Sequence, residues 1–244
     1  MPVIAQKPRK KHRKSNDGLS SIAPPARDSA PTQHPRFTIL IGSRARRTED
    51  QSSDLDIVRI GHTNPATKIG KQRVEPTYID YDVSAFWRLF ERGDLFLYHV
   101  FKEGRLLEGD KATWALLKQN FRVGKDFGEE ISRNRKFLRW LQRGSKYDGA
   151  IVPYLAHLCR ALKNLAIFSL AEQRDYIFDK RRALRKAFPT LSDESISLLV
   201  NANNSFERNP ARALSYPAID STNIKRLNRE IALAANLPRA NAAR

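Results

Sequence analysis

Apolar residues follow two different periods along this chain of 244 residues. In the first half, short runs of apolar and β-favouring residues alternate with polar, turn-rich stretches, and these runs predict strands at 37–41, 55–60 and 77–84. From residue 111 onward, apolar residues recur every three or four positions, most regularly over 151–172, as in amphipathic helices. The sequence therefore predicts an α+β protein that ends in a helical bundle.

Three segments differ in composition. Residues 1–36 hold a basic block at 7–14 and then a stretch rich in Ser, Pro and Ala, which predicts a disordered basic tail. This tail could bind phosphates or serve only to keep the chain soluble. Residues 37–110 are predicted to form a small α+β domain, and residues 111–244 a helical domain.

Positive charge is unevenly distributed over these segments. The whole chain carries a net charge of +18, of which the tail holds +6, residues 37–120 hold +1 and residues 121–244 hold +11. Such a field favours a polyanionic partner, and RNA is the simplest candidate. Many small basic proteins have no such partner, so charge alone does not decide the question.

One motif carries the chemistry of the first half. An apolar run ends at Gly42-Ser43, ten residues follow, and Asp54-Leu55-Asp56 then leads into the next run. Gly42 lets the backbone approach a ligand, and Ser43 stands where a short helix can begin and receive a phosphate. On a strand the two carboxylates point to one face, where they can bind a hard cation such as Mg²⁺.

This motif resembles that of the nucleotidyltransferase superfamily, which includes DNA polymerase β, the minimal nucleotidyltransferases and the aminoglycoside nucleotidyltransferases. The string Gly42-Ser43-Arg44-Ala45-Arg46 is similar to that of the minimal members, which usually carry Gly where this chain has Arg47. The resemblance covers about residues 37–110 and implies a small mixed sheet, a two-metal Mg²⁺ site and ATP or another NTP as substrate. It implies metal binding by Asp54 and Asp56, and contacts to the phosphates from Gly42, Ser43, Arg44 and Arg46.

The family also uses a third carboxylate on the strand after Asp-x-Asp. Asp80 and Asp82 are rival candidates, and Asp82 is preferred because Val83-Ser84 follows it as in relatives. In the helical half, Arg160 and Lys163 could face the triphosphate or the acceptor, or could simply be solvated. His99 is interpreted as a packed helix residue.

The leading hypothesis is an enzyme that transfers a nucleoside monophosphate, AMP from ATP as first choice, to a hydroxyl of an RNA or protein acceptor. One alternative is an aminoglycoside-type enzyme with a small-molecule acceptor. Another is a non-catalytic nucleic-acid-binding or antitoxin-like protein with a toxin-type protein partner. The single cysteine, Cys159, excludes an intramolecular disulfide, and without a membrane span or a secretory leader the expected location is the cytoplasm.

Overall fold

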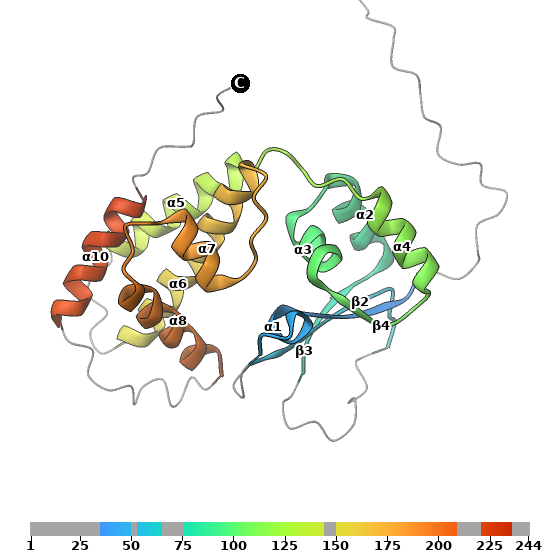
Figure 1. Ribbon diagram of the computed structural model, residues 1–244, viewed down its shortest axis with the longest axis horizontal. Coiled ribbons are helices and arrows are strands. Elements are labelled where there is room, and N and C mark those ends of the chain that lie inside the picture. The colour runs from blue at the N-terminus through green and yellow to red at the C-terminus, as the bar shows by residue number, and fades with distance from the viewer. Residues whose placement is uncertain (1–34, 50–52, 65–75, 144–149, 209–220, 236–244) are drawn as a thin grey trace, which may run out of the picture. The chain divides into compact units, whose positions relative to one another are not determined.

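The fold is described from a computed structural model (Figure 1). The structure describes residues 35–49, 53–64, 76–143, 150–208 and 221–235. The described residues from Pro35 onward form one compact unit. The predicted disordered tail at 1–36 lies outside the described residues except for its last two positions.

A four-stranded sheet forms the first half, with the strand order β3-β2-β1-β4. Strand β1 is antiparallel to both of its neighbours, whereas β2 and β3 are parallel, so the sheet is mixed, as expected. The strands are β1 (Phe37–Ile41), β2 (Leu55–Ile60), β3 (Pro76–Tyr81) and β4 (Arg105–Glu108). The first two match the predicted ranges. The third is shorter than predicted, because Asp82 begins the next helix.

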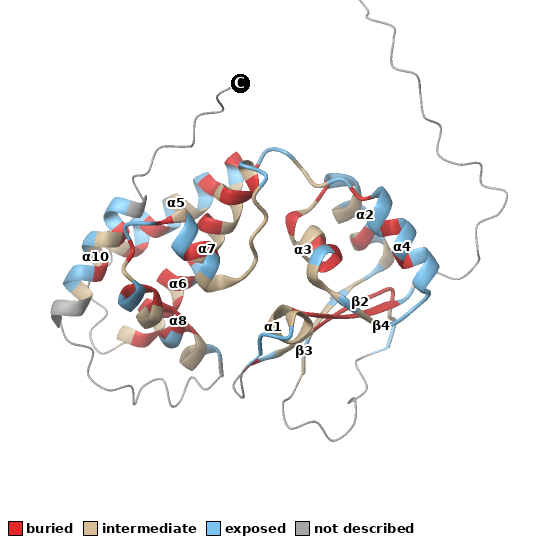
Figure 2. Cartoon of the chain, viewed as in Figure 1, coloured by how far each residue is buried: buried red, intermediate tan, exposed pale blue. Residues whose placement is uncertain are grey.

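Helices α2 (Val83–Arg92), α3 (Leu95–Glu103) and α4 (Lys111–Asn120) contribute to the core of the sheet. The short helix α1 (Gly42–Arg46) lies between the first two strands. Strand β1 is buried along its whole length (red in Figure 2). Helix α2 ends at Gly93, which adopts a left-handed φ of 69°, and the carboxylate of Asp94 then accepts the backbone N–H of Phe96 to start α3.

Helix α4 packs with the sheet. Its residues Trp114 and Leu117, together with Phe121, lie in the same hydrophobic cluster as Phe37 of β1. The cluster that holds the helical bundle together includes Phe127, a few residues further on. The packing therefore changes between 121 and 127, so α4 groups with the sheet and not with the bundle, although the predicted boundary lay at 110. Apolar side chains on α4 fit either core, which is why periodicity alone could not assign it.

The bundle consists of α5 (Gly128–Arg143), α6 (Ile151–Glu172), α7 (Lys180–Ala187), α8 (Asp193–Arg208) and α10 (Ser221–Ala235). Helix α6 is central, and its fully buried Leu155, Leu158, Leu162 and Leu165 form the stripe that the sequence predicted. Together with the mixed sheet, this bundle confirms the predicted α+β class. Within the described residues, no helix is both long enough and apolar enough to cross a membrane.

Candidate active site

The turn between β1 and α1 brings Gly42 against Asp56. Gly42 has a φ of 75°, and a Cβ atom built on it would lie 3.1 Å from Oδ2 of Asp56. The antiparallel pairing of Ile41 with Asp56 creates this proximity, since it places the end of β1 beside the start of β2. Any other residue at position 42 would be strained and would crowd the carboxylate. Glycine therefore leaves open space in front of Asp56.

The short helix α1 ends at Arg47, the position where the minimal nucleotidyltransferases usually carry Gly. Arg47 adopts the left-handed conformation, with a φ of 60°, and its backbone N–H donates to the carbonyl of Ser43. A left-handed conformation costs a residue other than glycine about 1–2 kcal/mol, so the surrounding turn must hold it in place. The turn thus keeps the shape that glycine would favour.

Arg44 and Arg46, both expected to contact phosphates, are bonded to protein groups instead. The Arg44 guanidinium donates to the carbonyls of Ser53 and Asp54, with its shortest bond, from Nη2 to Ser53, at 2.9 Å. It ties α1 to the segment that carries Asp54. Arg46 pairs with Glu103 at 2.8 Å and lies 3.7 Å from an oxygen of Asp179. Both guanidinium groups thus bind protein groups here, and their expected contact with phosphates stays a prediction.

The two carboxylates of the Asp-x-Asp string differ in exposure. Asp54 is exposed just before β2 begins, and Asp56 is half-buried within the strand. Burial raises the pKa of Asp56, and the charges of Asp54 and Glu207 raise it further, against the opposing effects of His99 and Lys163. Carboxylates that repel each other in a partly desolvated place are a suitable site for a divalent cation, because the cation removes the repulsion. The donor set fits Mg²⁺, which binds one or two carboxylates and completes its shell with water and phosphate oxygens.

Asp80 points away from this pair. Side chains alternate along a strand, and Ile79 and Tyr81 pack on the core face with Val58, so Asp80 lies on the other face of the sheet. There its carboxylate accepts two bonds of 2.7 Å from the guanidinium of Arg59. This hydrogen bonding lowers the pKa of Asp80. Asp80 is therefore a structural ion-pair partner.

Asp82 lies too far along β3 to join the site. In the parallel register Asp56 pairs with Thr77, so Asp82 is five residues further on, about 16 Å away along an extended strand. Its carboxylate accepts the backbone N–H of Ala85 at 2.6 Å and caps α2. The preference for Asp82 as third carboxylate is thus not supported by the geometry, and neither rival joins Asp54 and Asp56. Among the described residues, no three His, Cys, Asp or Glu side chains gather as a metal-binding group.

Lys163 of α6 is the cation that the bundle supplies to the site. It lies close enough to Asp56 for its charge to lower the pKa of that carboxyl group. Burial lowers the pKa of Lys163 itself, the positive charge of Lys180 lowers it further, and Glu207 opposes them. Lys180 is bonded to Asn204 and Arg160 to Glu207, whereas the described part of the chain offers Lys163 no such bond. Lys163 is therefore available to an anionic ligand.

Two residues near the carboxylates carry no recognisable signal in the sequence. The ring of His99 stacks on Phe178 with centroids 4.4 Å apart, and its Nε2 lies 3.2 Å from Glu103. Burial raises the pKa of Glu103, but His99 and Arg46 outweigh it and the net shift is downward. Glu207 reaches the site from α8, more than 150 residues after Asp56. Only tertiary packing brings these residues to the motif.

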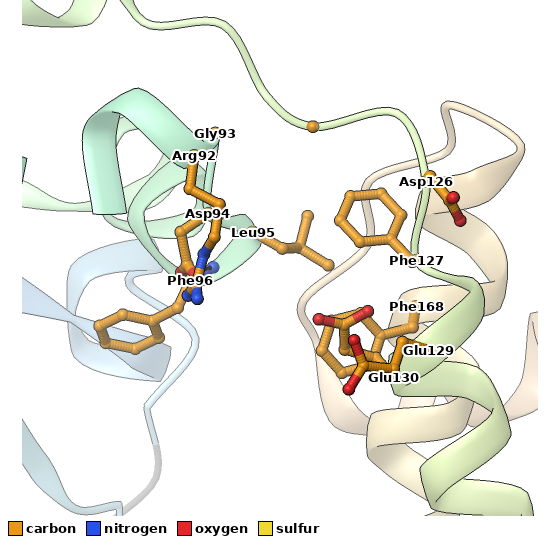
Figure 3. Close-up of a pocket in the computed structure, with 11 residues that line it drawn as sticks. Arg92, Gly93, Asp94, Leu95, Phe96, Asp126, Phe127, Glu129, Glu130 and Phe168 are labelled. Carbon is orange, nitrogen blue, oxygen red and sulfur yellow. Dashed lines mark hydrogen bonds and ion pairs between the residues drawn. The ribbon is translucent and has the colours of Figure 1, made fainter. Parts of the chain in front are cut away.

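A separate pocket of about 330 Å³ lies beside the start of α3 and the start of α5 (Figure 3). Four carboxylate residues line it, together with three phenylalanines and a single arginine: Asp94, Asp126, Glu129, Glu130, Phe96, Phe127, Phe168 and Arg92. In Figure 3, Leu95 points toward Phe127 across the cavity. The acidic lining of this pocket disfavours the binding of phosphate groups. The ring of Phe96 contacts that of His99, which connects this pocket to the surroundings of Asp56.

A comparison with solved structures finds a distant similarity. The spectinomycin adenyltransferase AAD(9) from Enterococcus faecialis, solved with ATP and spectinomycin, resembles the chain with a TM-score of 0.41 at 16% sequence identity. The likeness covers 83% of this chain and 91% of that one. No protein-family model and no curated protein sequence matches the chain, so the functional assignment rests on its own residues.

Proposed function

We propose that this protein is a metal-dependent nucleotidyltransferase that moves a nucleoside monophosphate, AMP from ATP as first candidate, to a hydroxyl of an acceptor. One observation carries the proposal. A left-handed Gly42 leaves space in front of Asp56, whose carboxylate oxygen is 3.1 Å from where a Cβ would lie, and Asp54 stands two residues before it. A phosphate group can approach the backbone there and share a cation with both carboxylates.

Each residue has a distinct part in this reaction. Asp54 and Asp56 would hold Mg²⁺, which when bound neutralises charge on the triphosphate. The backbone at Gly42 and the hydroxyl of Ser43 would receive phosphate oxygens, and Lys163 would face the triphosphate from the bundle. The acceptor oxygen forms a bond to the α-phosphorus as the bond to pyrophosphate breaks, and the hydroxyl proton passes to water. Orientation and charge stabilisation supply the rate acceleration.

The proposed acceptor is an RNA or a protein, in keeping with the +11 net charge of residues 121–244. A second candidate is a small polycationic compound, as in the aminoglycoside-type enzymes, and the acidic pocket of Figure 3 is the observation that favours it. Exchange of Glu130 for Gln would raise the KM for such a compound and leave transfer to RNA unchanged. A variant with the same KM for cationic compounds as the unmodified protein would remove this candidate.

Label transfer tests the proposal. The protein with Mg²⁺ is given each α-labelled NTP in turn, with total RNA, whole-cell protein or a panel of aminoglycosides as acceptor. Asp56→Asn should reduce transfer by about 10³-fold or more, since the metal site is worth several kcal/mol in the transition state. Asp82→Asn is the matched control, because asparagine caps a helix as well as aspartate does. Absence of both transfer and nucleotide binding in the unmodified protein would refute the proposal.

A further inference from the structure

Helix α5 exposes two aromatic side chains on its outer face. Trp140 is 63% exposed and Phe137 is 38% exposed. Their rings are stacked, with centroids 5.8 Å apart and planes within 13° of parallel. Residues three apart lie on the same side of a helix, and the buried residues of α5, Ile131, Leu138 and Leu141, leave both rings exposed beside them. The pair therefore forms an exposed, flat aromatic surface that no helix of the described part covers.

Helix α5 is strongly basic around the aromatic pair. From Ile131 to Arg143 the helix carries five Lys and Arg residues and no Asp or Glu. Lys136 and Arg139, next to the aromatic pair in sequence, are exposed, and no carboxylate of the described residues pairs with either. Arg133, one turn before Phe137, is exposed and pairs with Glu129 at 2.9 Å. Cations on both sides of the rings disfavour burial against an apolar partner, because both charges would have to be desolvated.

We infer that this face of α5, formed by Lys136, Phe137, Arg139 and Trp140, binds single-stranded nucleic acid. Unpaired bases stack on exposed aromatic rings, and the neighbouring cations bind the phosphates that link those bases. In a duplex the bases are stacked on one another inside the helix, so they cannot stack on the two aromatic rings. The face contains none of the residues proposed for nucleotidyl transfer, so the inference holds whether or not that reaction takes place.

Binding is measured on the full chain carrying Asp56→Asn, without NTP, so that no reaction contributes. The probes are a labelled 20-nucleotide RNA of mixed sequence, the DNA of the same sequence and the duplex of each, followed by fluorescence anisotropy. Phe137→Ala with Trp140→Ala should weaken single-strand binding about 10–100-fold, the usual loss when a stacking residue is removed. Duplex binding should not change. The relative affinities of the RNA and the DNA show which strand the face prefers.

A charge variant and its control separate stacking from general attraction. Lys136→Ala with Arg139→Ala should reduce the slope of log affinity against log salt by about 1.4, the value for two single-strand phosphates. Lys111→Ala with Lys118→Ala removes two exposed charges from α4 and should change neither the affinity nor the slope. Circular dichroism confirms that all variants keep their helices.

Three results would overturn the inference. One is an unchanged single-strand affinity in the aromatic variant. Another is an equal loss in the α4 control, which would mean that net charge alone attracts the strand. The third is self-association of the unmodified protein that the aromatic variant lacks, with RNA affinity unaltered, since that would assign the face to contacts between protein chains.

Discussion

Asp54-Leu55-Asp56 and Asp80-Tyr81-Asp82 have the same spacing and lie on two strands that pair with each other. The first string stands at the start of β2, beside the turn at Gly42, and the pKa of Asp56 is raised by burial and by Asp54. The second stands at the end of β3, where Arg59 lowers the pKa of Asp80 and a helix N-terminus engages Asp82.

The difference follows from parallel pairing. In a parallel pair the start of one strand lies beside the start of the other, so carboxylates at the start of β2 and at the end of β3 are separated by the length of the strands. The groups that surround each carboxylate then determine whether it can bind a ligand. In the first pair, burial and the charge of Asp54 raise the pKa of Asp56, whereas in the second pair both carboxylates accept hydrogen bonds from protein groups.

The largest effect that tests this comparison is expected at Lys163, the cation facing the first pair. Lys163→Ala should weaken nucleotide binding about 10–100-fold, since a hydrogen bond to a charged group is worth about 1.5–3 kcal/mol. Titration calorimetry with ATP and Mg²⁺ measures it. Lys186→Ala, which removes a cation already paired with Asp175 at 2.6 Å, serves as the control.

The lowered pKa of Lys163 gives this binding a pH dependence. Lysine is charged below its pKa, so nucleotide affinity should fall as the pH rises through a value below the ordinary 10.5. Lys163→Arg should abolish that fall, because the guanidinium stays charged. The same affinity profile in both proteins would show that Lys163 does not contact the nucleotide.

Exchange of Asp80 for Ala should destabilise the fold and leave transfer intact. The guanidinium of Arg59, whose side chain is 9% exposed, would lose both of its bonds, at a cost of about 1–3 kcal/mol in the free energy of unfolding. Denaturant unfolding measures it. Because the folded pKa of Asp80 is depressed, this contribution is present above the ordinary value of 3.8 and is lost as the pH falls through the folded value. Loss of transfer without loss of stability would instead place Asp80 in the active site.

A smaller effect is expected at Asp82. Asp82→Ala removes the N-cap of α2 and should lower the free energy of unfolding by about 1 kcal/mol, and Asp82→Ser should restore most of it. Transfer should stay within about twofold of the unmodified protein in both variants. Activity that fails in Asp82→Ser despite restored stability would return Asp82 to the role of third carboxylate.

The smallest and most telling effect concerns the metal-free protein. Asp56→Asn removes the repulsion with Asp54, so without Mg²⁺ the variant should unfold at a slightly higher temperature than the unmodified chain. The sign follows from the raised pKa of Asp56, because such a carboxyl group stabilises the fold below its ordinary pKa and loses that contribution as the pH rises through the folded value. Adding Mg²⁺ should stabilise only the unmodified protein. A variant that is less stable without the metal would show that Asp56 holds the fold together.

The local parts of this protein follow from its sequence. The apolar runs at Phe37–Ile41 and Leu55–Ile60 give the first two strands as predicted, and the leucine stripe of α6 gives the bundle its central helix. Glycine at position 42 and the spacing to Asp54 also give the centre of the candidate site, because these depend on chain geometry over a few residues. Even the left-handed turn at Arg47 forms without the glycine that the minimal nucleotidyltransferases usually carry there.

Only the tertiary structure determines which charged side chains lie close to one another. The parallel register of β2 and β3 separates Asp82 from Asp56, and the alternation along β3 turns Asp80 toward Arg59. Packing of the bundle brings Lys163 and Glu207 to Asp56 from more than 100 residues away, and assigns α4 to the sheet. Periodicity reports which face of an element is apolar but not which neighbour covers it. The partners of a charged side chain, and thus its function, depend on that neighbour.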